Sequence, residues 1–133
     1  MPSEMLTFHH VGCVVKDLAE AIETYRPLAR GIGSIVHVAS QNVRICFIEV
    51  SPHSFIELIE PAGPDSAVSQ LLQKRTTFYH VGFLANDFDA ALGQLVAQGY
   101  MHLGSFCSEA FGMRRCAFLA SPIAHLIEII ERG

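Results

Sequence analysis

The chain has 133 residues, half of them hydrophobic and 17% of them charged, which is the size and composition of one globular domain. Its nine Lys and Arg residues form no basic stripe and the formal net charge is −4, so nucleic acid is not an expected partner. The apolar runs are far shorter than the ~20 residues that span a bilayer, so we expect no membrane association and a cytoplasmic location. The four cysteines lack a CxxC spacing and are expected to be reduced thiols.

The first half of the chain predicts a strand, a helix and three further strands. After an apolar run that opens the pattern, Asp17 can cap a helix with Glu20 at its third position. An apolar stripe follows at helical spacing, and Pro27 disturbs the helix near its end. Three β-type runs come next, over residues 33–39, 43–50 and 54–60.

The stretch PAGPDSAVSQLLQKRTT joins this half to the next. Its prolines turn the chain, and Asp65 or Ser66 can cap a short helix over residues 68–74. The apolar residues of that helix predict a packed connector and not a flexible linker.

The second half predicts the same elements in the same order. Asp87 is the expected helix cap, and Gly99 is the expected helix stop. The three β-type runs that follow lie over residues 100–106, 113–120 and 124–130.

The two halves are copies of one unit. Residues 8–25 align with residues 78–95 at an offset of 70, with identity at six of 18 positions. Residues 44–60 align with residues 115–131 at an offset of 71. We therefore expect one α+β domain over residues 1–133, built from two βαβββ modules. The modules are expected at residues 5–61 and 76–132, with the connector at 62–75.

The repeat separates the two histidines of the sequence FHHVG. His10 matches His80 in the second copy, whereas His9 matches Tyr79. Successive strand residues point to opposite faces, so the two neighbouring histidines face opposite ways. His10 and His80 are therefore the histidines that occupy equivalent places.

Two glutamates also occupy equivalent positions in the two copies: Glu57 interrupts the apolar run FIELI, and Glu128 interrupts LIEII. A carboxylate in such a strand is costly unless it is paired, protonated or bound to a cation. Any one of these polar residues alone would be an ordinary strand residue, but two imidazoles and two carboxylates suit a divalent ion such as Co, Ni, Zn, Mn or Fe(II). If a pseudo-twofold axis relates the modules, one site can form with coordination positions open to substrate. Its ligands would be His10, Glu57, His80 and Glu128.

The segments HHVGCVVKDLAEAIETY, FIELIEP, DSAVSQLLQK, YHVGF and RRCAFLASPIAHLIEII follow one another over nearly the whole chain. In this order they resemble the vicinal oxygen chelate superfamily of glyoxalase I, bleomycin-resistance proteins and dioxygenases. Within it the sequence is most similar to methylmalonyl-CoA epimerase-type members. The resemblance implies that the βαβββ modules form a cup-shaped, half-open β-barrel with helices outside. It places the ligands of one divalent metal on His10, Glu57, His80 and Glu128.

The resemblance also implies an enzyme that moves the proton α to the carbonyl of a small acyl-CoA or related thioester through a metal-stabilised enolate. Racemising one carbon ordinarily needs two acid/base groups, and Glu128 is the catalytic candidate for one of them, ahead of Glu57. Some members carry another carboxylate on the third strand of the first module, where this chain has Arg44. The second acid/base group is therefore unassigned.

The candidate substrate-binding residues are Arg44, Arg115 and Phe118. The arginines can bind a substrate carboxylate, with solvated strand positions as the alternative, and Phe118 can line an apolar part of the site. Two other functions stay open: a glyoxalase I-type lactoylglutathione lyase acting on a glutathione adduct, and a non-catalytic module that binds a small molecule. The resemblance further implies a homodimer, in which the metal site lies within one chain or is shared between two.

Overall fold

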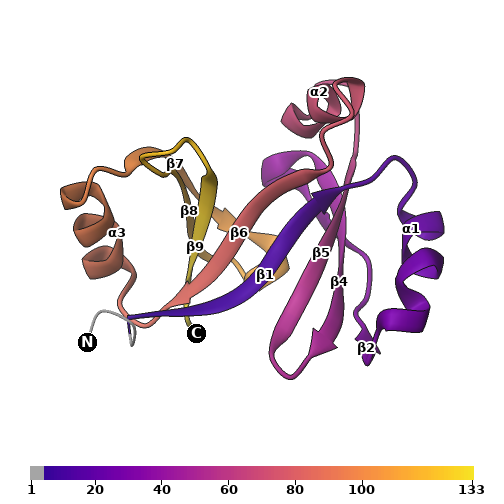
Figure 1. The fold of residues 1–133 in the computed structure, drawn as a ribbon, viewed down its shortest axis with the longest axis horizontal. Coiled ribbons are helices and arrows are strands. Elements are labelled where there is room, and N and C mark those ends of the chain that lie inside the picture. The colour runs from indigo at the N-terminus through magenta and orange to yellow at the C-terminus, as the bar shows by residue number, and fades with distance from the viewer. Residues whose placement is uncertain (1–4) are drawn as a thin grey trace. The chain divides into compact units, whose positions relative to one another are not determined.

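The computed structural model describes residues 5–133 (Figure 1). The chain divides into two compact units, which we call the first unit and the second unit. The first unit spans residues 10–79, and the second unit combines residues 5–9 with residues 80–133. Each unit is therefore mostly one copy of the sequence repeat, but a short segment at the start of the chain belongs with the second copy.

The described residues follow the predicted α+β order, with the second strand of the first copy split in two. The first copy contains β1 (Leu6–Val14), α1 (Leu18–Tyr25), β2 (Gly31–Ile32), β3 (Val36–Val38), β4 (Val43–Ser51) and β5 (Ser54–Pro61). The connector carries α2 (Ala67–Gln73). The second copy contains β6 (Phe78–Ala85), α3 (Phe88–Ala97), β7 (Met101–Ser108), β8 (Arg114–Ala120) and β9 (Leu126–Glu131).

The sheet of the first unit has the strand order β2-β4-β5-β1, and β3 also pairs with β4. β1 and β5 run parallel, whereas β4 is antiparallel to its neighbours. α1 lies against one face of this sheet (Figure 1), where Leu18 and Ile22 join a buried cluster. The sheet contributes Cys46, Ile48 and Leu58 to that cluster. Because strand residues alternate, the residues between them point to the opposite face.

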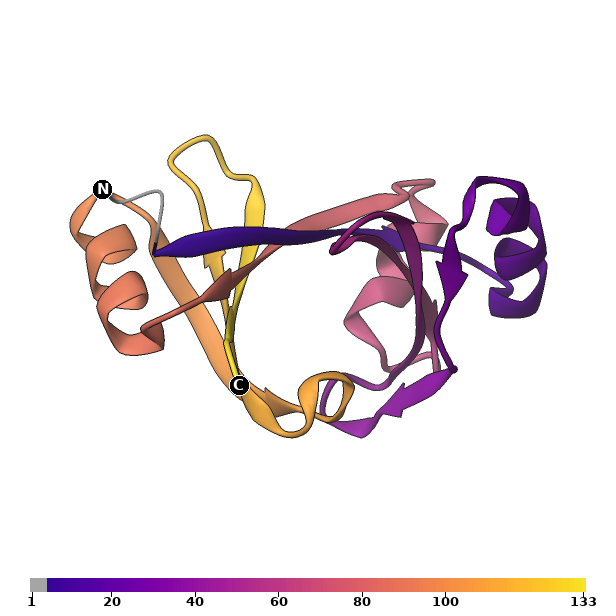
Figure 2. The same cartoon turned by 90° about the horizontal axis from the view of Figure 1, so that it is seen from below.

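The sheet of the second unit repeats this plan with the order β6-β9-β8-β7. β6 and β9 run parallel, and the other two pairings are antiparallel. The turned view in Figure 2 shows α3 beside the sheet of its unit, where Phe88 and Ala91 are buried. Ala117, Leu119 and Ile129 complete that cluster from the strands.

Both predicted helix caps are confirmed. The Asp17 carboxylate accepts a hydrogen bond from the backbone N–H of Glu20 at 3.1 Å, and the Asp87 carboxylate accepts one from Ala90 N–H at 3.1 Å. The cap satisfies a backbone donor that has no partner within the helix. α1 then gives way to a 3-10 turn that contains Pro27, as expected for a residue without a backbone N–H.

The strand predictions need two corrections. The strand expected over residues 33–39 is shorter, since only β3 (Val36–Val38) falls in that range and the two-residue strand β2 precedes it. Between the two, Gly33 donates its N–H to the Phe47 carbonyl at 2.9 Å. The last strand begins at Leu126 and not at residue 124, because Ala124 has a positive φ of 65° within a turn that Ser121 closes. Side-chain periodicity does not report such backbone bonds.

The connector helix α2 starts one residue before the predicted range. Ser66 occupies its N-cap position, but the side chain makes no capping hydrogen bond. The buried Ser66 hydroxyl has no hydrogen-bond partner within residues 5–133. None of the helices in that range is long and apolar enough to cross a membrane.

Candidate functional site

The first unit holds a buried histidine beside a buried glutamate. His10 lies on β1 and Glu57 on β5, and the parallel pairing of these strands sets Gly12 opposite Glu57. His10 shares a face with Gly12, two residues further along the strand. His10 Nε2 is 3.2 Å from Glu57 Oε1, with side-chain exposures of 0% and 9%. An imidazole and a carboxylate are therefore removed from water together.

The second unit holds an equivalent pair. His80 lies on β6 and Glu128 on β9, with Gly82 opposite Glu128 in the parallel pairing. His80 Nε2 is 3.2 Å from Glu128 Oε1, and the exposures are 3% and 6%. The two copies of the sequence repeat thus make the same His–Glu contact.

A phenylalanine accompanies each pair. Phe47 on β4 is the cross-strand partner of Glu57, and its ring meets the His10 ring edge to face at a centroid distance of 5.5 Å. Phe118 on β8 is the partner of Glu128 and meets the His80 ring at 5.4 Å. Aromatic edges of this kind restrict how the imidazole rings can rotate. The predicted lining residue Phe118 therefore lies beside the His80–Glu128 pair.

The side of each sheet that carries its His–Glu pair is called the inner face below; it lies opposite the face on which the helix packs. Strand alternation fixes this assignment, because Glu57 adjoins Leu58, which belongs to the helix-side cluster. The field of the buried carboxylate extends to β1, where burial and, to a lesser degree, the Glu57 charge raise the pKa of the Cys13 thiol.

The donor atoms of each pair suit a cation. A neutral imidazole nitrogen and a carboxylate oxygen are both ligands for divalent transition metals. Buried charges need such a partner or a proton, because desolvation of an isolated carboxylate costs several kcal/mol. Each of His10, Glu57, His80 and Glu128 is buried and offers one ligand atom of this type.

The two arginines predicted to bind substrate lie on the other face. Arg44 Nε donates to Glu60 at 2.7 Å, and the other Glu60 oxygen accepts the backbone N–H of Leu18 at the start of α1. Glu60 is three residues from Glu57 on β5, so it points to the helix side. The guanidinium of Arg44 therefore joins the sheet to α1 and is not brought to the His10–Glu57 pair.

Arg115 has the equivalent role in the second unit. It donates to Asp89 at 2.9 Å and to Glu131 at 2.9 Å, and its guanidinium lies 4.6 Å from the centre of the Phe88 ring. The hydrogen bonds that Arg115 donates to Glu131 and Asp89 raise its pKa above the ordinary value. The hydrogen bond from Arg115 lowers the pKa of Glu131 in turn. This cluster fixes α3 to the sheet on the face opposite Glu128.

His9, which precedes His10 in the chain, has different surroundings. His9 is half-buried in the second unit, and its ring meets the Phe111 ring at a centroid distance of 5.5 Å. His10, one residue later, begins the first unit. The structure therefore places His10 beside Glu57 and His9 beside an aromatic side chain.

One acidic residue on the inner face of the first unit was not predicted. Glu49 follows Phe47 by two residues on β4 and so points to the same side as Glu57. The repeat does not reveal it, because Ala120 occupies the related position in the second copy. Strand alternation over residues 43–50 was the signal available in the sequence.

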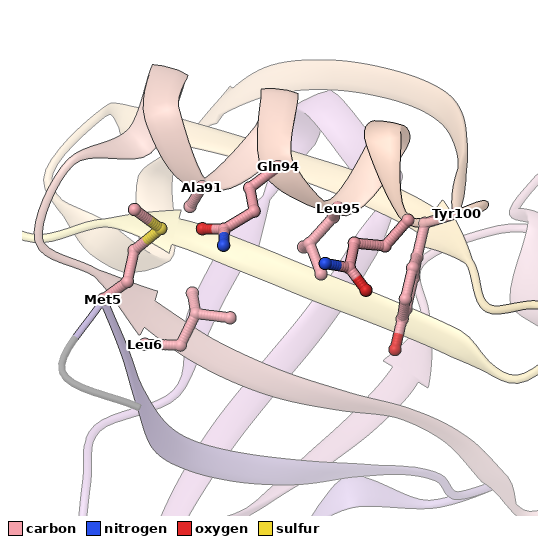
Figure 3. A pocket seen from close by; sticks show the side chains of 7 residues that line it. Met5, Leu6, Ala91, Gln94, Leu95 and Tyr100 are labelled. Atoms are coloured by element: carbon pink, nitrogen blue, oxygen red, sulfur yellow. The ribbon is translucent and has the colours of Figure 1, made fainter. Parts of the chain in front are cut away.

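A cavity of about 300 Å³ lies on the helix side of the second unit (Figure 3). Side chains of α3, including Ala91 and Leu95, line it from one side, and Met5 and Leu6 line it from the other. The remaining lining residues are Gln94, Gln98 and Tyr100. The cavity is therefore separated from the His80–Glu128 pair by the sheet.

Comparison with known proteins extends over both units. The family model of the glyoxalase/bleomycin resistance protein/dioxygenase superfamily matches residues 9–118. An ethylmalonyl-CoA/methylmalonyl-CoA epimerase from Cereibacter sphaeroides is 31% identical over 100 residues, which are 73% of this chain and 74% of that protein.

Two solved structures are similar to nearly the whole chain. The methylmalonyl-CoA epimerase from Mycobacterium tuberculosis matches with a TM-score of 0.77 and 27% identity, over 95% of this chain and 87% of that chain. A hypothetical protein from Bacillus halodurans has a TM-score of 0.85 at 22% identity, over 96% of this chain and 95% of that chain. The second match concerns the fold alone.

Proposed function

This chain belongs to the glyoxalase/bleomycin resistance protein/dioxygenase superfamily, as its motifs predicted, and from that premise we propose that it is a metal-dependent epimerase of a small acyl-CoA or related thioester. The observation that carries the proposal is the buried His–Glu contact at equivalent positions of both modules. The similarity to the Cereibacter sphaeroides epimerase over 73% of the chain favours a thioester substrate.

We infer that both pairs hold a single divalent ion. The proposed ligands are His10, Glu57, His80 and Glu128. Their burial and donor types support this, because two imidazoles and two carboxylates suit Co, Ni, Zn, Mn or Fe(II). The course of the chain supports it too, because the chain passes from one unit to the other directly before His10 and again directly before His80. Each histidine is thus joined by its own peptide bond to a residue of the other unit, His10 to His9 and His80 to Tyr79.

The reaction transfers a proton at the carbon α to the thioester carbonyl. A bound divalent ion supplies positive charge that stabilises the enolate oxygen, a charge absent from the ground state. Glu128 removes or returns the α-proton, because its carboxylate is buried beside the place where the substrate is activated. Phe118 presents an apolar surface next to it and excludes water from the reacting carbon.

Solvent deuterium exchange tests the proposal. Methylmalonyl-CoA is incubated in deuterated water with the metal-loaded protein, and mass spectrometry follows the label at the α-carbon. We expect incorporation and interconversion of the two epimers. A metal-loaded protein that incorporates no label would exclude the epimerase activity.

A glyoxalase-type lyase is the second candidate. The matched family model favours it, as does the presence of one carboxylate beside each histidine, because a glutathione hemithioacetal could rearrange through the same enolate chemistry. Formation of a thioester from methylglyoxal and glutathione, followed by its ultraviolet absorbance, distinguishes the two reactions. We expect no turnover in that assay if the epimerase proposal is correct.

A further inference from the structure

The inner face of the second unit carries an aromatic pair beside its His–Glu pair. Phe118 on β8 stands opposite Glu128 and meets the His80 ring at 5.4 Å. Its ring also stacks on Phe106 of β7, with a centroid distance of 5.6 Å and an interplanar angle of 22°. Both phenylalanines are half-buried. An apolar surface therefore begins at the proposed metal ligands and extends to β7, the last strand of this sheet.

Gly104 interrupts this surface on β7. It stands opposite Phe118 and lies two residues before Phe106, so all three residues share the inner face. Because Phe118 stands opposite Glu128, the row across three strands runs from Gly104 to Glu128. Strand spacing puts the backbones of these two residues about 10 Å apart. A Cβ on Gly104 would meet no heavy atom within 4 Å apart from its two chain neighbours, so open space lies over it.

The backbone does not explain this glycine. Gly99 and Gly112 have positive φ angles, whereas Gly104 does not, so an L side chain fits its conformation. The register shifts between His102 and Gly104, but the β-bulge that demands glycine has a positive φ. A glycine inside a strand weakens it, because glycine loses more conformational freedom on folding and offers no side chain to pack. Gly104 therefore destabilises its strand without a local need.

The related glycine of the first unit has a packing role. Gly33 lies beside Phe47 as Gly104 lies beside Phe118, and its N–H donates to the Phe47 carbonyl at 2.9 Å. A Cβ on Gly33 would lie 3.2 Å from that carbonyl oxygen, so a side chain there would crowd the backbone. Gly104 has no such neighbour. A strand glycine without a packing role often marks a place that a ligand approaches closely.

The strands around Gly104 favour an uncharged ligand group. β7 contains no Asp, Glu, Lys or Arg. Of the two arginines on β8, only Arg114 has the inner-face position, and it lies four residues from Phe118. Its guanidinium donates to the carbonyls of Phe111 and Glu131 at 2.7 and 3.4 Å. An alkyl group is stabilised by burial against the rings, whereas a carboxylate would lose hydration there without a cation on β7.

We propose that Gly104, Phe106 and Phe118 form a subsite for the alkyl group on the α-carbon of the thioester. The absent side chain at Gly104 admits a group larger than methyl. This inference rests on the proposed epimerase activity, because it takes the thioester carbonyl to lie beside Glu128. The α-carbon is bonded to that carbonyl carbon, so its alkyl group reaches the Phe118 ring first and the space over Gly104 next. The substrate class is thioesters with an ethyl or longer α-alkyl group.

The test compares methylmalonyl-CoA with ethylmalonyl-CoA, which differ by one methylene in this group. We measure kcat/KM for interconversion of the epimers with metal-loaded wild type and Gly104→Val, and expect wild type to turn over both thioesters. The substitution should lower the ethyl-to-methyl ratio of kcat/KM by about 10–200-fold, the usual effect of one methylene in an apolar pocket. Metal content should match wild type. The midpoint of thermal unfolding should rise, because valine suits a strand better than glycine.

Two further variants complete the test. Gly104→Ala fills less of the space, so it should lower the ratio by less, and it replaces Gly104→Val if that variant fails to fold. Gly93→Val is the matched control, because a Cβ there is also in open space but Gly93 is exposed on α3, and its ratio should equal wild type. An unchanged ratio in both Gly104 variants, or a wild type that turns over only methylmalonyl-CoA, would overturn the inference alone. A wild type that turns over neither thioester would overturn the proposed epimerase activity and the inference together.

Discussion

On the inner faces, ionisable side chains are buried at positions where their desolvation costs free energy. His10 and Glu57 are buried side by side, and so are His80 and Glu128. Removing one member of a buried charged pair typically costs ~3–5 kcal/mol, because the other is left uncompensated. A fold stabilised only by packing would not need such groups in mid-strand. Their presence in both modules is what makes function, and not stability, the better explanation.

The two adjacent histidines should therefore respond differently to substitution. We expect His10→Ala to abolish binding of the divalent ion, because it removes a proposed ligand, and His9→Ala to leave binding intact, because His9 packs against Phe111. Metal content after purification without chelators is the measurement. Loss of metal in His9→Ala with retention in His10→Ala would contradict the assignment.

The repeat distinguishes His10 from His9, because His10 has a histidine, His80, at the equivalent position of the second copy. It cannot place Arg44 and Arg115, since their direction depends on which strand register brings Glu60 and Glu131 opposite them. Residues that differ between copies, such as Glu49, carry no repeat signal at all.

At the scale of helices and strands, the helix caps could be predicted from the sequence, whereas the pairing of backbone segments distant in sequence could not. The caps at Asp17 and Asp87 follow from residue type and spacing, because they involve atoms only three residues apart. The short strands β2 and β3 both pair with β4, and between them Gly33 donates its N–H to the Phe47 carbonyl, so their extent depends on partners distant in sequence. Such non-local backbone pairing leaves little trace in hydrophobic periodicity.

The helix caps give a stability prediction with an internal control. Asp87→Ala should lower the free energy of unfolding by about 1 kcal/mol, because the Ala90 N–H loses its acceptor. Ser66→Ala should change it little or raise it slightly, because the buried hydroxyl makes no capping bond. Urea denaturation followed by circular dichroism measures both. Equal losses in the two variants would show that cap geometry does not account for the effect.

At the scale of the whole chain, duplication distributes one function over two units. Each unit supplies one histidine and one glutamate, which is half of the proposed ligand set. The sequence repeat predicted the α+β order of elements that the described residues follow. It could not predict that residues 5–9 join the second unit, because strand exchange between copies leaves the hydrophobic pattern unchanged.

That division makes the origin of the ligands testable with two variants. If one chain supplies all four ligands, His10→Ala and His80→Ala should each bind no metal, and an unfolded and refolded mixture of both should bind none. If instead each site combines the first unit of one chain with the second unit of another, a mixed dimer would contain one intact set and recover metal. We expect no recovery, because both histidines directly follow crossings of the same chain. Metal analysis of the refolded mixture, with refolded wild type as the control, decides between the two arrangements.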